Sequence, residues 1–305
     1  MNCKYGFLDG VSYLESYGNG DIKECTVSVE NILETEYGKL IPQYNDDSER
    51  RKLKPSLSFY ENGTMKKVYL QEKTNIKTEA GIILAEFIMF YDDGSVKKIF
   101  PLDGKLTGFW TEQHEYELAE KLKLQTPVGL IESKIINISF YKSGKVKGIT
   151  LWPKERIVIK TPVGMTGIRT GITFYESGAI KSFEPAKMTE VKTPIGTLMA
   201  YDMSPLGIHG DNNSLVFYED GNVKSVSTST DEILIHGNGE EYTYSPMETI
   251  SMCSDDKKDL LSMKIEFEDG KIYLDNKKVK FKMNEFTFEV NNYVVDAEKC
   301  AGSCC

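Results

Sequence analysis

The sequence is poor in the residues that catalytic and metal sites most often use. Its 305 residues include only three histidines, His114, His209 and His236, which share no ligand spacing. His209 with Asp211 could bind a metal or share a proton, although a loop of this composition is usually a turn. No P-loop, nucleophile elbow or dinucleotide fingerprint occurs. No reaction class is indicated, and we expect a protein that is not an enzyme.

Long hydrophobic runs and an excess of positive charge are also missing. The longest apolar run, residues 81–91, is about half of a membrane span and contains Glu86. The N-terminus lacks the apolar core of a signal peptide, so we expect a cytoplasmic protein with no transmembrane segment. A net charge of -9 repels phosphate backbones and argues against nucleic-acid binding. With 40% hydrophobic and 27% charged residues, the composition is that of a folded protein.

One short motif, Phe-Tyr-x-x-Gly-x-apolar-Lys, recurs along the chain. In each copy an apolar alternation stops at a polar-polar-Gly turn and apolar residues resume two positions later, which predicts a β-hairpin. The first and last copies are weaker, and the last one lacks the Tyr and the Lys. The turn glycines of the seven copies are Gly20, Gly63, Gly94, Gly144, Gly178, Gly221 and Gly270.

The register of these hairpins follows from the turn. A three-residue loop with Gly63 in the left-handed conformation pairs Phe59 with Met65. A two-residue turn would pair Phe59 with Lys66 instead. Because an aromatic and an apolar residue recur at the positions of Phe59 and Met65, we expect the three-residue loop, with both side chains on one face.

A second motif, Thr-x-x-Gly, alternates with the first and indicates another turn, whose geometry the sequence leaves open. It starts at Thr35, Thr78, Thr126, Thr161 and Thr193. Strong helix formers over residues 111–123 predict one short helix. We therefore expect an all-β fold of stacked antiparallel β-hairpin repeats, forming an elongated twisted sheet or an open β-solenoid. A single domain would cover residues 1–295, and a flexible Cys-rich tail residues 296–305.

The hairpin pattern resembles the variant form of the MORN repeat, which is found in many bacterial proteins. The resemblance covers roughly residues 15–275. It implies an elongated, twisted antiparallel sheet of stacked hairpins and a role in binding proteins or, in some relatives, lipids. The Gly-rich second half of the usual MORN unit is missing here, and the Thr-Pro-x-Gly turn takes its place.

If the repeats stack in register, their tyrosines and lysines form two adjacent rows. The rows comprise Tyr60, Tyr91, Tyr141, Tyr175 and Tyr218, and Lys66, Lys97, Lys147, Lys181 and Lys224. Such a surface could bind an acidic protein partner or, as a weaker alternative, anionic lipid head groups in peripheral membrane contact. The competing interpretation is that the lysines discourage edge pairing and the tyrosines pack along the sheet. The first functional hypothesis is a non-enzymatic protein-interaction scaffold.

The last six residues contain Cys300, Cys304 and Cys305. These thiols could hold zinc, copper or iron, or Cys300 could close a disulfide loop with either of the others. The alternative is a tail without a role. The second functional hypothesis is therefore a metal-binding or thiol-redox protein that acts through this tail. The remaining cysteines, Cys3, Cys25 and Cys253, are expected to be buried or incidental small hydrophobes.

Overall fold

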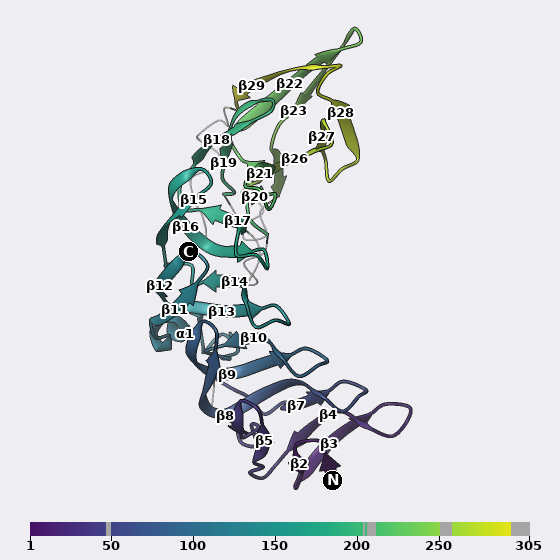
Figure 1. Ribbon diagram of the computed structural model, residues 1–305, viewed down its shortest axis with the longest axis vertical. Helices are drawn as coiled ribbons and strands as arrows, with labels where there is room; N and C mark the ends of the chain where they lie inside the picture. Colours follow the sequence, from purple (N-terminus) through teal and green to yellow (C-terminus); the bar gives the residue numbers. More distant parts are fainter. Residues whose placement is uncertain (47–49, 204, 206–211, 251–257, 294–305) are drawn as a thin grey trace. The chain divides into compact units, whose positions relative to one another are not determined.

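The chain folds almost entirely into antiparallel β-strands (Figure 1). The computed structural model describes residues 1–46, 50–203, 205, 212–250 and 258–293. Contacts between residues divide the chain into two compact units, residues 1–152 and 153–305. Among the described residues α1 is the one α-helix. The predicted all-β class of antiparallel hairpins is confirmed, whereas the single domain over 1–295 stays a prediction.

The first unit is built on one antiparallel sheet with the strand order β14-β13-β10-β9-β8-β7-β4-β3. Three further pairs, β1-β2, β5-β6 and β11-β12, form separate two-stranded hairpins. The elements are β1 (Asn2–Cys3), β2 (Gly6–Phe7), β3 (Val11–Ser16), β4 (Ile22–Val27), β5 (Leu33–Thr35), β6 (Gly38–Leu40), β7 (Leu57–Phe59), β8 (Met65–Thr78), β9 (Gly81–Phe90), β10 (Val96–Phe100), α1 (Glu112–Leu118), β11 (Leu122–Thr126), β12 (Gly129–Ser133), β13 (Ile135–Phe140) and β14 (Val146–Leu151).

The second unit repeats this plan with the order β28-β27-β26-β21-β20-β17-β16, and β15 pairs with β16. Smaller sheets are formed by β18-β19, by β24-β25 and by β23-β22-β29. The elements are β15 (Ile157–Thr161), β16 (Gly164–Phe174), β17 (Ile180–Pro185), β18 (Thr189–Thr193), β19 (Gly196–Ala200), β20 (Leu215–Phe217), β21 (Val223–Thr228), β22 (Asp231–Gly237), β23 (Glu240–Tyr244), β24 (Met247–Ile250), β25 (Lys258–Leu261), β26 (Met263–Glu268), β27 (Lys271–Leu274), β28 (Val279–Lys282) and β29 (Thr287–Asn292).

The Phe-Tyr-x-x-Gly hairpins have the predicted three-residue loop. The Tyr60 N–H donates to the carbonyl of Thr64 at 2.8 Å, and Gly63, at φ +74°, donates to the carbonyl of Tyr60 at 2.9 Å. Phe59 pairs with Met65, and both side chains are buried. The other pairs in this register are Ser16↔Ile22, Phe90↔Val96, Phe140↔Val146, Phe174↔Ile180 and Phe217↔Val223.

The last copy uses a tighter turn. Phe267 pairs with Ile272, and Glu268 with Lys271, so only two residues lie in the loop. Both of them, Asp269 and Gly270, have positive φ, which is the requirement of a type I′ turn. The three-residue loop expected for every copy is therefore wrong for the last hairpin, although its phenylalanine still pairs with the apolar residue after the turn.

The Thr-x-x-Gly motif also forms a two-residue loop, closed by the threonine side chain. Thr78 pairs with Gly81, donates its hydroxyl to the Gly81 carbonyl at 2.9 Å and accepts the Ala80 N–H at 3.2 Å. Gly81 has a φ of +116°, which a residue with a side chain rarely adopts. The same pair of bonds closes the turns at Thr35, Thr126, Thr161 and Thr193.

The predicted helix is present but short. Thr111 caps its N-terminus by accepting the His114 N–H, and His114 returns a bond through its side chain. The helix ends at Leu118, because residues from Leu122 onward pair with β12 and form the next hairpin. Its inward residue, Glu115, is buried.

Neighbouring Phe-Tyr-x-x-Gly hairpins are joined by their tyrosines. In five copies the phenolic hydroxyl of the tyrosine donates to the backbone carbonyl of the phenylalanine in the following copy. In the first unit the bonds are Tyr17 to Phe59, Tyr60 to Phe90 and Tyr91 to Phe140, each at 2.9 Å. In the second unit they are Tyr175 to Phe217 at 2.8 Å and Tyr218 to Phe267 at 2.6 Å. Within each unit, these tyrosines therefore join their own hairpin to the next one.

Replacing one of these tyrosines tests the link. We expect Tyr60→Phe to lower the free energy of unfolding by about 0.5–1.5 kcal/mol, because one hydrogen bond is lost while the ring remains. The control is Tyr13→Phe, since the Tyr13 side chain is 47% exposed, and it should change stability by less than about 0.5 kcal/mol. Urea unfolding of both variants measures the difference; equal effects would show that the hydroxyl does not join the hairpins.

Candidate binding site

The lysines and tyrosines of the two predicted rows contact one another within single copies of the motif. In five of the seven copies the lysine ammonium lies over the ring of its own tyrosine. The distances from Nζ to the ring centroid are 5.6 Å for Lys66 and Tyr60, 5.5 Å for Lys97 and Tyr91, 5.5 Å for Lys147 and Tyr141, 5.7 Å for Lys181 and Tyr175 and 5.2 Å for Lys224 and Tyr218. A cation–π contact therefore pairs each of these lysines with the tyrosine of its own copy. Their role in partner binding stays a prediction.

The cysteines of the second hypothesis, Cys300, Cys304 and Cys305, lie outside the described residues, as do Cys253, His209 and Asp211. Cys25 is fully buried, and burial raises the pKa of its thiol to about 11. Cys3 is half-buried, and burial raises its thiol pKa too. In the parts of the chain that the structure describes, no three His, Cys, Asp or Glu side chains gather into a metal-binding group.

The two described histidines have local roles. His114 accepts the Thr111 N–H with Nδ1 at 3.3 Å, so it belongs to the helix cap. His236 lies 3.2 Å from the Glu241 carboxylate, and both side chains are exposed.

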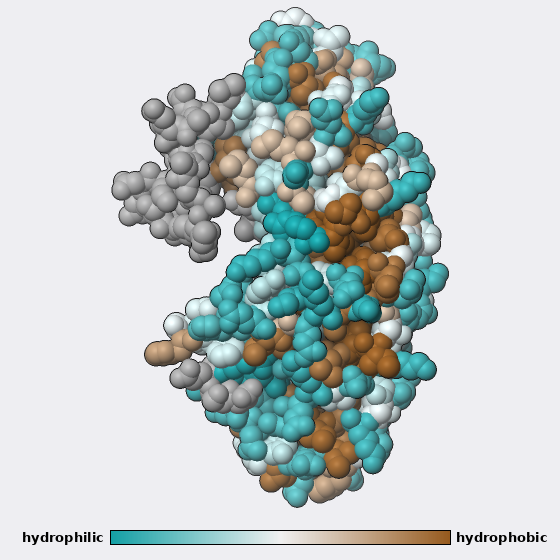
Figure 2. All heavy atoms as spheres, turned by 90° about the vertical axis from the view of Figure 1, so that its left-hand side faces the viewer, coloured by the Kyte–Doolittle hydropathy of each residue, from teal (hydrophilic) through white to brown (hydrophobic). Residues whose placement is uncertain are grey.

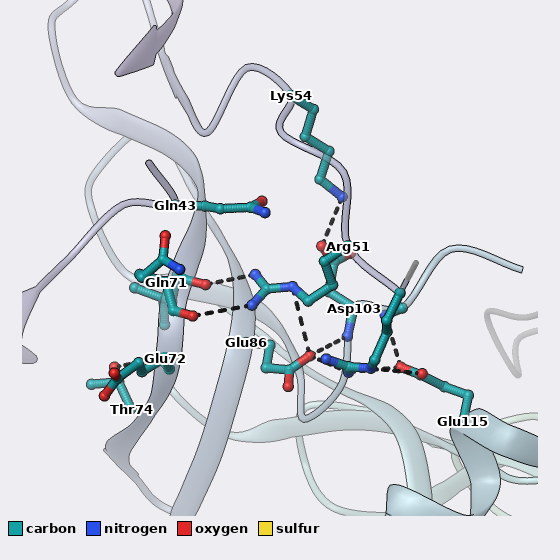
Figure 3. Close-up of polar contacts among 12 residues, drawn as sticks. Gln43, Arg51, Lys54, Gln71, Glu72, Thr74, Glu86, Asp103 and Glu115 are labelled. Carbon is teal, nitrogen blue, oxygen red and sulfur yellow. Dashed lines mark hydrogen bonds and ion pairs between the residues drawn. The ribbon is translucent and has the colours of Figure 1, made fainter. Parts of the chain in front are cut away.

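A buried cluster of charged side chains lies in the first unit (Figure 3). Arg50 bridges two buried carboxylates: its Nη2 lies 2.5 Å from Glu86, and its Nε and Nη2 each lie 2.9 Å from Glu115. Arg51 points the other way and donates to the carbonyls of Leu70 and Gln71 at 2.6 and 3.3 Å. The cluster therefore connects the segment after β6 to the central strands and to α1.

The carboxylates of this cluster are already occupied by donors. Glu115 also accepts the Trp110 indole N–H at 2.6 Å and the Gly104 N–H at 2.7 Å, and Glu86 accepts the Asp103 N–H at 2.8 Å. Burial opposes ionisation of Glu115, but the bonds from Arg50 and Trp110 outweigh it and lower its pKa. Both oxygens of Glu115 and the Oε2 of Glu86 accept these bonds, and both side chains are buried. This arrangement is that of a structural clamp.

A pocket of about 390 Å³ opens elsewhere in the first unit, between the tips of the β1-β2 and β5-β6 hairpins. Tyr5 and Tyr37 stand at these tips. Their hydroxyls accept the backbone N–H groups of Met65, at 3.0 Å, and Val96, at 3.2 Å. Each tyrosine ring is thus held over one hairpin of the main sheet, and Met65 and Phe90 line the pocket beneath.

The rim of this pocket carries mainly negative charge. Glu34, Glu36 and Asp93 line it, together with Lys4. Hydrogen bonds from the Ser95 hydroxyl and N–H lower the pKa of Asp93, so its carboxylate is ionised at neutral pH. Burial and the neighbouring Glu36 carboxylate raise the pKa of the Tyr37 hydroxyl, which stays protonated. The pocket combines aromatic walls with an anionic rim.

Tyr5 and Tyr37 were not predicted as site residues, because only one of their two turns has the complete Thr-x-x-Gly motif. Cys3-Lys4-Tyr5-Gly6 forms the same two-residue loop as Thr35-Glu36-Tyr37-Gly38, with Cys3 paired to Gly6 and Thr35 to Gly38. In the later copies the position of Tyr37 is occupied by Ala80, Val128, Val163 and Ile195. Tyrosine at the third position of the first two turns is the signal in the sequence.

In three of the Thr-x-x-Gly hairpins, an exposed apolar side chain follows the turn glycine. Ile82 is 67% exposed, Leu130 66% and Met165 70%, and each comes directly after the glycine of its Thr-x-x-Gly turn. Figure 2 faces the side on which β11 and β12 lie in Figure 1 and shows hydrophobic residues exposed among hydrophilic ones. The same position is polar in the other two copies, which have Lys39 and Thr197 there.

Searches of protein-family models, curated proteins and solved structures find no match to this chain. In the described part of the chain, no helix combines the length and the apolar character needed to cross a bilayer.

Proposed function

We propose that the chain is a non-enzymatic, cytoplasmic protein-interaction scaffold built of MORN-like hairpin repeats. The observation that carries this proposal is the exposed apolar residue after the turn glycine, which recurs as Ile82, Leu130 and Met165. Folding does not need these side chains, since each lies mostly in water, and burial against a partner would stabilise a complex.

The build of the repeats supports the same proposal. Tyrosine hydroxyls join consecutive hairpins, and lysines lie over the tyrosine rings, so a surface spread over several copies is held in fixed register. A partner that binds such a preorganised surface loses little free energy in ordering it. Repeat arrays provide extended surfaces of this kind.

The test is affinity capture with the whole chain and with the variant Ile82→Glu/Leu130→Glu. Both substitutions lie in the first unit at exposed positions, so folding should be unaffected. We expect a protein partner whose affinity falls at least about tenfold, because each charge replaces a side chain worth about 1.5 kcal/mol or more on burial.

The matched control is Leu14→Glu, which places the same charge at an apolar position on β3 that is 40% exposed. A partner bound equally by the parent chain and by Leu14→Glu, and lost with the double variant, supports the proposal. If every captured protein binds the double variant as well as the parent, the exposed apolar residues are not the contact surface and the proposal fails.

A further inference from the structure

A lysine lies directly opposite the exposed apolar residue on two of the Thr-x-x-Gly hairpins. Lys77 pairs with Ile82 across the β8-β9 hairpin, and Lys160 pairs with Met165 across the β15-β16 hairpin. Residues that oppose each other in an antiparallel pair project from the same face. Both lysines are exposed, so each hairpin presents an ammonium group beside an apolar side chain. One such face occurs in each of the two units.

In the first unit the next hairpin adds a second lysine. The Gln125 N–H donates to the Ala80 carbonyl at 2.9 Å, which holds β11 against the turn of the β8-β9 hairpin. The carbonyl oxygen of Lys123 lies 3.7 Å from the position of a Cβ added at Gly81, the residue before Ile82. The backbone of a second lysine thus lies beside the turn that carries Ile82. The exposed residues of β11 and β12 are Lys123, Gln125, Leu130 and Glu132.

The carboxylates of the chain do not neutralise these lysines. In the part of the chain that the structure describes, no ion pair is formed by Lys77, Lys123 or Lys160. The β15-β16 hairpin contains no Asp or Glu, although the chain as a whole has a net charge of -9. The face around Lys160 and Met165 is therefore basic and apolar.

The first unit has two acidic residues within the paired segments 74–85 and 122–133, Glu79 and Glu132. Glu79 is directed at the main sheet, since its Oε1 lies 3.5 Å from the position of a Cβ added at Gly144. Glu132 pairs across the strands with Lys123. Neither residue opposes Lys77, so the ammonium group beside Ile82 has no carboxylate opposite it.

A face of this kind selects a partner by charge as well as by hydrophobicity. Covering Ile82 or Met165 with a partner removes water from the neighbouring ammonium group, which is costly unless a carboxylate replaces that water. A charge-assisted hydrogen bond from lysine to a carboxylate supplies the replacement, while the lysine stem covers apolar surface. A basic segment is repelled instead.

We propose that the partner of the scaffold is an acidic protein segment in which carboxylates stand directly beside apolar side chains. Its apolar side chains cover the exposed apolar residues of the Thr-x-x-Gly hairpins, and its carboxylates accept hydrogen bonds from Lys77, Lys123 and Lys160. The inference rests on the proposed function, because it names the partner of the same apolar residues. It adds a requirement for charge that the proposed function does not contain.

The experiment is a titration of the full chain at low salt, followed through the methyl NMR signals of Ile82, Leu130 and Met165. The probes are three acetylated and amidated hexapeptides, in which leucine alternates with glutamate, leucine with lysine, or serine with glutamate. We expect the leucine-glutamate peptide to bind at least about fivefold more tightly than either of the others, since only it matches both the charge and the apolar side chains. Equal binding of the leucine-glutamate and leucine-lysine peptides, or unmoved signals with all three, would overturn the proposal.

Variants assign the preference to the lysines. Lys77→Gln/Lys123→Gln should weaken the leucine-glutamate peptide about threefold or more at the Ile82 and Leu130 signals, and Lys160→Gln about twofold at the Met165 signal. Each variant is the control for the other unit. Lys39→Gln is the matched control on the β5-β6 hairpin, where the lysine side chain is 67% exposed, and it should leave both affinities unchanged. An undiminished preference in the lysine variants would contradict the assignment.

The same variants keep the inference and the proposed function apart. A captured protein partner that is lost with Ile82→Glu/Leu130→Glu, but bound fully by the triple variant Lys77→Gln/Lys123→Gln/Lys160→Gln, would leave the proposed function standing and overturn the acidic partner. Full binding to both variants would remove both.

A last arm distinguishes a protein segment from a membrane, which also presents anionic groups beside apolar ones. The probes are vesicles of phosphatidylcholine with and without phosphatidylserine, sedimented with the parent chain and with the triple lysine variant. Retention on the anionic vesicles that the triple variant loses, without a preference for the leucine-glutamate peptide, would assign the faces to a membrane and overturn the proposal. The peptide preference without retention on vesicles supports it.

Discussion

We expect Arg50→Ala to lower the free energy of unfolding of the first unit by about 3–5 kcal/mol. The substitution leaves Glu86 and Glu115 buried, at 4% and 3% exposure, without the guanidinium that bridges them. An unpaired buried carboxylate costs far more than a surface ion pair contributes. This loss is a large fraction of a stability that is typically about 5–15 kcal/mol.

Tryptophan fluorescence during urea unfolding measures the loss. The sequence contains only Trp110 and Trp152, both within residues 1–152, and Trp110 donates directly to Glu115. The control is Lys23→Ala, which removes a half-exposed ion pair with Glu15 on the edge strands and should cost less than about 1 kcal/mol. Equal losses of unfolding free energy in Arg50→Ala and Lys23→Ala would contradict the structural role of the buried Arg50 cluster.

The pH dependence of the free energy of unfolding, compared between the parent chain and Arg50→Ala, separates the effect of the charge from that of the packing. The pKa of Glu115 is lowered in the folded chain, so its ionised form stabilises the fold above the ordinary value of 4.5, and this contribution is lost as the pH falls through the lowered pKa. Arg50→Ala removes the main cause of the lowering. Its stability should therefore fall less steeply on acidification than that of the parent chain.

The hairpins could be predicted from the sequence because their determinants are local. A polar-polar-Gly loop and the apolar residues on either side of it are close in the chain, so Phe59↔Met65 and its counterparts follow from the turn alone. The exception was the last copy, where two residues instead of three separate the phenylalanine from the glycine and Asp269-Gly270 forms a two-residue turn. The partner of the tyrosine hydroxyl was not predictable either, because Tyr60 reaches a carbonyl that lies 30 residues away.

The candidate site depends on contacts of still longer range. Tyr5 meets Met65 at a separation of 60 residues, and Tyr37 meets Val96 at 59. Arg50 and Glu115 are 65 residues apart, and both lie outside the repeated motifs. No periodic pattern marks such positions. The sequence predicts which hairpins form. It does not predict which side chains the Thr-x-x-Gly hairpins place against the main sheet, because those contacts exist only in the folded chain.

In the second unit the largest loss is expected for the phenylalanine of the repeat. Phe217 is fully buried and packs against Phe183, with ring centroids 5.8 Å apart. We expect Phe217→Ala to lower the free energy of unfolding by about 3–5 kcal/mol, because a large cavity replaces the ring, and Phe217→Leu to cost less, about 1.5 kcal/mol. Since the tryptophans belong to the first unit, far-UV circular dichroism during urea unfolding is the measurement.

Tyr218→Phe, the neighbouring substitution, completes this experiment. Tyr218 donates to the Phe267 carbonyl at 2.6 Å, and losing that bond should cost about 0.5–1.5 kcal/mol. Met165→Ala is the control, since its side chain is 70% exposed and it should change stability by less than about 0.5 kcal/mol. The expected order, with Phe217→Ala well above Tyr218→Phe, means that the phenylalanine stabilises its own hairpin by packing while the tyrosine joins it to the next. If Tyr218→Phe costs as much as Phe217→Ala, the links between hairpins, and not the packing of their rings, dominate the stability of the repeats.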